Sequence, residues 1–106
     1  MKEVPNLSYI DQLAHENPLL RERLIGIIKD EFPTEVQKYK LENHQSDYFL
    51  MSESVHKLKH KFALLGLEKG YHLAADFEDE LRAGSKNLQS DFEDVLKVIE
   101  LFLSKI

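Results

Sequence analysis

An apolar stripe near the middle of the chain constrains the fold more than any other feature of the sequence. Met51, Val55, Leu58, Phe62 and Leu65 follow one another at alternating spacings of four and three residues. An α-helix turns by about 100° per residue, so these side chains share one face. This spacing is typical of a helix whose apolar face packs inside a bundle. The stripe therefore predicts a central helix with one buried face.

Start and stop signals divide the rest of the chain into further helices. Asn17 is expected to cap a second helix that has Pro18 at its first position. Pro33 is expected to kink or break that helix. Gly66 and Gly84 are expected to end the central helix and the helix after it.

Weaker signals refine these boundaries. They are a capping box from Ser8 to Asp11, a new start at Thr34, a cap at Ser46 or Asp47, and a last start at Asn87 or Ser90. The expected helices cover residues 6–13, 18–43, 46–65, 68–83, and from 87 or 90 to 103.

The pattern of these segments indicates the fold class. No window alternates apolar and polar residues with a period of two over a useful length, so no strand is predicted. The connections are short, which favours antiparallel neighbours. We therefore expect an all-α fold, an antiparallel up-down-up-down four-helix bundle with a short additional N-terminal helix. No linker or repeat divides the chain, so residues 1–106 are expected to form a single domain.

The composition limits the classes of protein to consider. The chain is 42% apolar and has no cysteine, which excludes disulfides and thiolate metal sites. Residues 1–6 lack the apolar run of a signal peptide, and no stretch approaches the roughly 18 apolar residues of a membrane span. A soluble cytoplasmic protein without membrane contact is expected. The net charge of -5 argues against nucleic-acid binding, whereas the locally basic residues 57–61 suit a single anionic group.

His56 points roughly 140° away from the apolar stripe, with Lys59 and His60 one turn further along. Three interpretations of this outward imidazole are open, and the simplest is a surface histidine without a chemical role. The second is a metal site, because His56 and His60 have the i, i+4 spacing of two ligands on one ion. However, Lys57 stands where the zinc-protease motif has its glutamate, and no third ligand follows at a fixed offset. Lys59 and Lys61 would also repel a dication, so no native metal site is expected.

The third interpretation is that His56 is a nucleophile for a phosphoryl group. An unperturbed imidazole is largely neutral at pH 7, so one ring nitrogen carries a free lone pair. The accepted group is negatively charged, and Lys59 could meet it as a point charge. Such a nucleophile must be exposed because its donor is another protein, and the helical phase of His56 provides that exposure.

The residues around His56 resemble a known family. The segment from His56 to Lys59 is similar to the His-x-Leu-Lys core of histidine-containing phosphotransfer (HPt) domains of two-component phosphorelays. Family members continue with small residues, an apolar-glycine pair that ends the helix, and leucine and glutamate at bundle spacing on the next helix. The corresponding residues here are Ala63, Leu65, Gly66, Leu67, Leu73, Phe77, Glu78 and Leu81. The resemblance extends from about Leu7 to Leu103.

The resemblance implies a four-helix bundle that carries phosphate on an exposed histidine. His56 would accept a phosphoryl group from a phospho-aspartyl receiver domain and pass it to another receiver, with Lys59 stabilising the charge. The chain would be a phosphohistidine carrier without kinase activity of its own, and its four glycines form no phosphate-binding loop. It would hold no cofactor, because Mg²⁺ belongs to the receiver. The expected partners are receiver domains of hybrid histidine kinases and response regulators. The chain is expected to act as a monomer.

The docking surface for a receiver is expected on the side of His56. Phe49 lies two turns before His56, Ser52 falls between them, and His60 and Ala63 follow. Core packing is an equally good account of Phe49 and of four further candidates from neighbouring segments: Tyr9, Ile10, Leu13 and Ile28.

His60 departs from the family, which usually has glycine at this place to leave room for the receiver. Its imidazole could swing aside, contact the receiver or restrict which receivers dock. Phosphorylation on His60 is a further alternative, although the match at Leu58, Lys59 and Gly66 favours His56. Lys61 also stands where the family prefers a small residue. The alternative function is a helical module that binds receivers or kinases without carrying phosphate.

Overall fold

The computed structural model describes residues 3–106, and all of its regular secondary structure is helical. The five helices are α1 (Ser8–Ala14), α2 (Pro18–His44), α3 (Tyr48–Leu64), α4 (Glu68–Arg82) and α5 (Gln89–Leu103). No strand occurs within residues 3–106, which confirms the all-α class. The structure does not describe Met1 and Lys2. These two residues are part of residues 1–6, the segment in which the sequence predicts no signal peptide.

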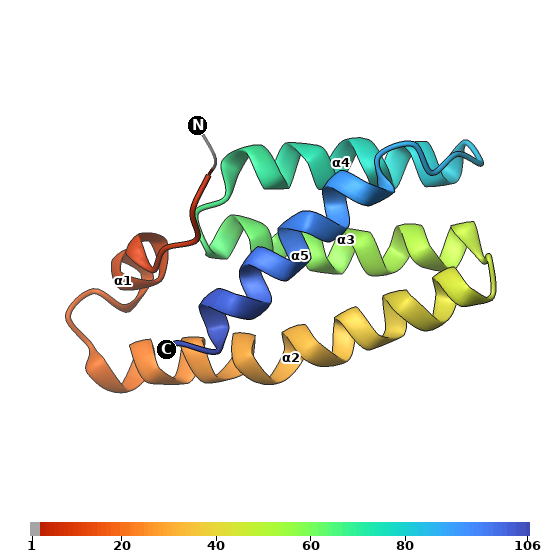
Figure 1. Cartoon of the computed structure of the whole chain (residues 1–106). Helices are drawn as coiled ribbons and strands as arrows, with labels where there is room; N and C mark the ends of the chain where they lie inside the picture. Colours follow the sequence, from red (N-terminus) through yellow and green to blue (C-terminus); the bar gives the residue numbers. More distant parts are fainter. Residues whose placement is uncertain (1–2) are drawn as a thin grey trace.

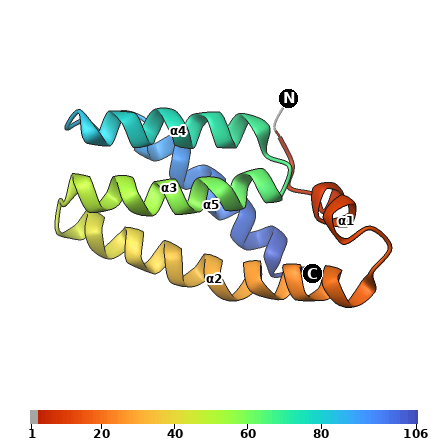
Figure 2. The same cartoon turned by 180° about the vertical axis from the view of Figure 1, so that it is seen from behind.

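Three of the helices form a layer that α5 covers on one side. α2, α3 and α4 lie side by side, and α5 crosses one face of them obliquely (Figures 1 and 2). α3 is the middle helix and contacts α2 and α4 extensively. α1 lies at the end of the layer where α2 begins (Figure 1). Because α5 crosses only one face, the opposite face of α3 has no helix over it (Figure 2).

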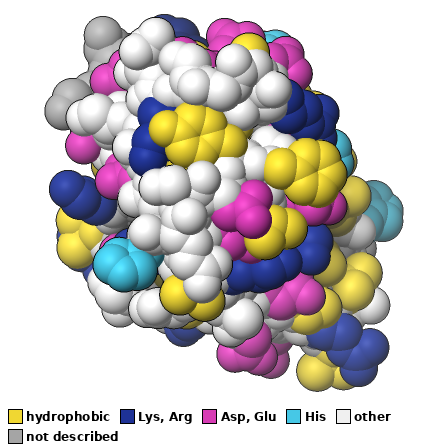
Figure 3. Space-filling view, turned by 90° about the vertical axis from the view of Figure 1, so that its right-hand side faces the viewer, with side chains coloured by type: hydrophobic (Ala, Val, Ile, Leu, Met, Phe, Trp, Pro, Cys, Tyr) yellow, Lys and Arg dark blue, Asp and Glu magenta, His cyan; other side chains and the backbone are white. Residues whose placement is uncertain are grey.

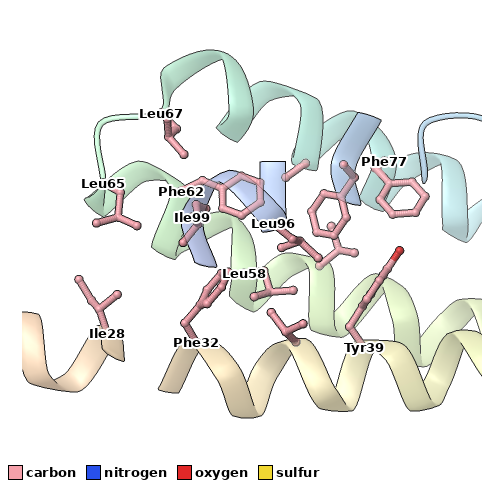
Figure 4. Packing of buried hydrophobic residues seen from close by; sticks show 14 of the residues in the cluster. Ile28, Phe32, Tyr39, Leu58, Phe62, Leu65, Leu67, Phe77, Leu96 and Ile99 are labelled. Atoms are coloured by element: carbon pink, nitrogen blue, oxygen red, sulfur yellow. The ribbon is translucent and has the colours of Figure 1, made fainter. Parts of the chain in front are cut away.

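One hydrophobic core, with side chains from all five helices, joins α5 to the layer (Figure 4). Phe92 of α5 lies among other aromatic rings, with its ring centroid 5.5 Å from that of Phe62 and 5.1 Å from that of Phe77. The predicted stripe of the central helix is completely buried in this core, at 0% exposure for Met51, Val55, Leu58, Phe62 and Leu65. The opposite side of α3 is therefore the side directed at solvent.

The caps predicted for the two longest helices are confirmed. The side chain of Asn17 accepts a hydrogen bond from the backbone N–H of Leu20 at 3.1 Å, with Pro18 at the first helical position. At the start of α3, Asp47 rather than Ser46 is the cap, and its side chain accepts from Leu50 N–H at 3.1 Å. Both caps satisfy amide groups that the first turn of a helix leaves without partners.

The caps predicted for the first and last helices are wrong. No capping box forms from Ser8 to Asp11; instead, the Asn6 side chain accepts from the backbone N–H of Ser8 at 3.0 Å. Neither Asn87 nor Ser90 caps α5. Its N-cap is Leu88, whose N–H donates to the Glu80 carboxylate at 2.7 Å. A carboxylate from the preceding helix thus replaces the local cap.

The helix α2 continues through Pro33, and no new helix starts at Thr34. Figure 1 shows a change of direction near the middle of α2, as expected where a proline removes a backbone donor. The flanking residues Phe32 and Val36 are 1% and 2% exposed. Burial of these side chains in the core keeps the helix continuous despite the missing hydrogen bond.

No helix within residues 3–106 combines the length and the apolar character needed to cross a bilayer. Figure 3 shows the end of the molecule where α2 meets α3, and there acidic, basic and apolar side chains are interspersed.

Gly66 ends α3 in a conformation that only glycine adopts easily, with φ at +76°. A Cβ atom added here would lie 2.6 Å from the Asn6 side-chain nitrogen, and Asn6 N–H is bonded to the Leu65 carbonyl at 2.9 Å. We expect Gly66→Ala to lower the free energy of unfolding by about 1–3 kcal/mol.

Two other glycines are controls for this prediction, and chemical denaturation measures all three variants. Gly84 also has a positive φ, of +83°, but open space around it, so Gly84→Ala should destabilise less. Gly26 lies inside α2 with nothing within 4 Å, so Gly26→Ala should be neutral or stabilising. Equal losses for Gly66→Ala and Gly84→Ala would show that the contact with Asn6 contributes nothing.

Candidate functional site

The outward side of α3 carries most of the residues predicted to face a partner. Phe49 is 64% exposed, and the His56 side chain is 50% exposed. His60 and Ala63 are exposed as well. Ser52 is a wrong prediction, since it is completely buried and its hydroxyl donates to the Phe49 carbonyl at 2.6 Å. By helical phase it lies on the same flank of α3 as Lys59, whose ammonium group contacts Glu78 of α4.

The candidates from neighbouring helices divide into two pairs. Tyr9 and Leu13 of α1 are each 45% exposed, so they remain available to a partner. Ile10 and Ile28 belong to the hydrophobic core, at 0% and 3% exposure. Ile10 and Ile28 are therefore core residues and are not available to a partner.

A carboxylate from α4 holds the ring of His56. Nδ1 of His56 lies 3.1 and 3.2 Å from the two carboxylate oxygens of Glu78. The Glu78 side chain is only 6% exposed, because Ala74 and Leu81 on the same face of α4 are buried in the core. Glu78 therefore contacts the Nδ1 side of the ring, and the His56 side chain as a whole is half exposed.

Two cations share the same carboxylate. Lys59 Nζ lies 3.1 Å from Glu78 Oε1, and Arg82 Nη2 lies 2.9 Å from Oε2. We call Glu78, His56, Lys59 and Arg82 the Glu78 cluster. The Lys59 side chain is only 13% exposed, because its ammonium group is directed at Glu78. Its ammonium group also lies 5.5 Å from the ring centroid of Tyr71.

The cluster fixes the proton of the imidazole. An ionised carboxylate only accepts hydrogen bonds, so Nδ1 of His56 is the donor to Glu78. A neutral imidazole has one protonated nitrogen, which leaves Nε2 with a free lone pair. Glu78 thus selects the tautomer in which Nε2 carries the free lone pair.

Glu78 stays ionised although it is buried. Burial by itself raises the pKa of Glu78, but hydrogen bonds from Lys59 and His56, together with their charges, outweigh it and hold the pKa below the usual value of 4.5. The cluster therefore stabilises the folded state above this pH.

This pKa shift predicts a loss of stability in acid. The ionised form of Glu78 is favoured in the folded state, so its contribution is complete above the unfolded value of 4.5 and is lost as the pH falls through the lower folded value. The difference in unfolding free energy between the wild type and Glu78→Gln should shrink over that range. Denaturation at a series of pH values measures it. A difference for Glu78→Gln that stays constant over this pH range would contradict the prediction.

His60 lies directly beside His56. The two ring centroids are 5.0 Å apart, and the ring planes meet at 87°. His60 is thus the immediate neighbour of the His56 ring on the outward side of α3.

The sequence did not explain why a lysine stands at position 61. In the structure, Lys61 of α3 contacts α2. Its ammonium group lies 3.0 Å from Glu31 and 3.3 Å from Glu35. Lys61 is therefore a structural cation on the side of α3 toward α2, distinct from the Glu78 cluster.

The sequence alone missed the roles of Glu78 and Arg82. Glu78 was assigned only as a residue at bundle spacing, and Arg82 was not assigned. One signal was present: Glu78 lies on the apolar face of its helix, between Ala74 and Leu81, where a charge needs a partner. Arg82 follows it by four residues, the spacing of a helical ion pair.

No group of three or more histidine, cysteine, aspartate and glutamate side chains placed to hold a metal ion occurs in the described part of the chain. Comparisons of the chain with models of protein families, with curated proteins and with solved structures give no match.

Proposed function

We propose that this chain is a cytoplasmic histidine phosphotransfer protein of a two-component phosphorelay. His56 accepts a phosphoryl group from a phospho-aspartyl receiver domain and passes it to another receiver. The observation that carries the proposal is the half-exposed imidazole of His56 with Nδ1 bound to the buried Glu78, which leaves Nε2 available. The proposal rests also on the sequence resemblance around His56.

The fold is consistent with this role. We propose that α2 to α5 form the up-down-up-down bundle of HPt domains and that α1 is the additional N-terminal helix. α5 crosses only one face of the layer (Figure 2), and His56 points away from the buried stripe of α3, so the side of α3 that carries His56 is uncovered. A receiver domain needs such an open face, because its phospho-aspartate must reach Nε2.

The transfer step follows from the geometry of the Glu78 cluster. The lone pair of Nε2 attacks phosphorus, a P–N bond forms, and the bond from phosphorus to the aspartyl oxygen breaks. The receiver's carboxylate leaves with the electron pair. Positive charge develops on the imidazole, and Glu78 stabilises it through the Nδ1–H bond. Transfer to the next receiver is the reverse step.

Lys59 and Arg82 have donors to spare for the phosphoryl oxygens. An ammonium group has three N–H donors and a guanidinium five, and each cation gives one contact to Glu78. Both cations share the Glu78 carboxylate with His56, so they can balance the negative charge of the bound group. The receiver supplies Mg²⁺, and this chain supplies the nucleophile and its charged surroundings.

An apolar depression next to the cluster suits the docking of a receiver. It is lined by Tyr9, Ala63, Gly66, Glu68 and Tyr71 and has a volume of about 330 Å³. Tyr71 links it to the cluster through its contact with Lys59. An apolar contact beside a charged site is the usual composition of a protein interface.

Phosphorylation of the native protein tests the proposal. The protein is incubated with phosphoramidate as a small donor, and separately with phosphorylated receiver domains. We expect a label that acid removes and base does not. Receiver binding without a label from any donor would overturn the proposal in favour of an interaction module that carries no phosphate.

A further inference from the structure

The imidazole of His60 is exposed beside His56, and the phosphotransfer step does not use it. The two residues are one turn apart on α3. The backbone between them is fixed, since Val55, Leu58 and Phe62 are completely buried. The pair is therefore held at a constant spacing on the open face of the layer.

The separation of the two rings is compatible with two ligands on one metal ion. Zinc binds an imidazole nitrogen at about 2.0–2.1 Å, so the centres of two rings on a tetrahedral ion lie about 5 Å apart. The observed separation of the ring centroids is 5.0 Å. Because Glu78 holds the ring of His56, only the exposed side chain of His60 has to rotate to direct a second nitrogen at a shared ion.

Glu78 prepares His56 as a ligand. Histidines that bind metals usually donate the other ring N–H to a carboxylate, which fixes the tautomer and makes the ligand nitrogen more basic. The bond from Nδ1 to Glu78, at 3.1 Å, is this arrangement. It was not visible in the sequence, where only the spacing of the two histidines indicated a metal.

The surrounding charges limit the affinity. Glu78 offsets only part of the charge of Lys59 and Arg82, and Lys57 is exposed next to His56. A site with only two protein ligands and with excess positive charge around it binds a metal ion weakly. It therefore suits an ion that exchanges with the solution. Imidazole ligands favour zinc and copper over magnesium and calcium.

We propose that His56 and His60 form a two-imidazole site for an exchangeable Zn²⁺-type ion that blocks the phosphoryl-accepting nitrogen. Both the ion and phosphorus need the Nε2 lone pair of His56, so binding of one excludes the other. The competition rests on the proposed phosphotransfer function, whereas the metal site itself does not.

Zinc titration of the native protein tests the site, followed by the ¹⁵N side-chain signals of all five histidines. Signals of His56 and His60 should move together and saturate at micromolar ZnCl₂, and EDTA should reverse the change. We expect His60→Asn to weaken binding at least about tenfold. The exposed His72 of α4 is the control, and His72→Asn should leave binding unchanged. Independent responses, or no saturation below millimolar zinc, would overturn the site.

Labelling with phosphoramidate in the presence of saturating zinc tests the competition. The label should fall in the wild type and stay unchanged in His60→Asn. If the wild type is labelled equally with and without zinc, the competition is wrong. If it is never labelled, the proposed phosphotransfer fails, and the titration alone still decides whether the metal site exists.

Discussion

Replacement of His56 by glutamine should abolish phosphorylation and leave the fold intact. The glutamine amide can still donate to Glu78, but it has no nucleophilic lone pair to replace Nε2. Because the glutamine keeps a donor for Glu78, the substitution should lower the unfolding free energy by no more than about 1 kcal/mol. Labelling with phosphoramidate and with a phosphorylated receiver measures the effect, and circular dichroism verifies the helical fold.

Two other histidines are matched controls for this variant. His60→Gln changes the neighbouring imidazole on the same helix, and His72→Gln changes an exposed one on α4. Both variants should still accept the label. A label that persists in His56→Gln and disappears in His60→Gln would move the phosphorylation site by one helical turn.

Replacement of Glu78 by alanine should slow phosphorylation of His56 by about 10–100-fold, by analogy with the loss seen when the carboxylate behind a metal-binding histidine is removed. Without the carboxylate, Nδ1 has no fixed acceptor, and both tautomers of the imidazole become populated. Lys59 and Arg82 also lose their shared partner. We expect the unfolding free energy to fall by about 1–3 kcal/mol, because the mostly buried Lys59 ammonium is left without its hydrogen bond.

Two further variants and one spectroscopic readout separate orientation from stability. Glu78→Gln keeps an acceptor for Nδ1–H but removes the charge, so its rate should lie between those of the wild type and Glu78→Ala. Asp79→Asn removes an exposed charge from the next position and should label normally. The ¹⁵N shifts of His56 report the tautomer directly. A single Nδ1–H tautomer and a normal rate in Glu78→Ala would show that Glu78 serves only the fold.

Some residues of the site could be placed from the sequence and others could not. The exposure of His56 and the burial of Leu58 follow from the phase of one helix, and the structure confirms both. The burial of Ser52 and the engagement of Lys59 depend on which flank of α3 is covered by α4. Helical phase gives the angle of a side chain about its own axis but not the position of a neighbouring helix. Ser52 and Lys59 were therefore assigned to the partner side.

The sequence determined the five helical segments, the apolar face of α3 and the outward direction of His56, because each depends on residues within a few turns of one another. Tertiary structure alone decided that Glu78, 22 residues further along the chain, meets His56 and binds Lys59 and Arg82 with the same carboxylate. It also decided that α5 crosses only one face of the layer and leaves the other open (Figure 2). Both results depend on how the helices pack against one another, which local periodicity does not specify.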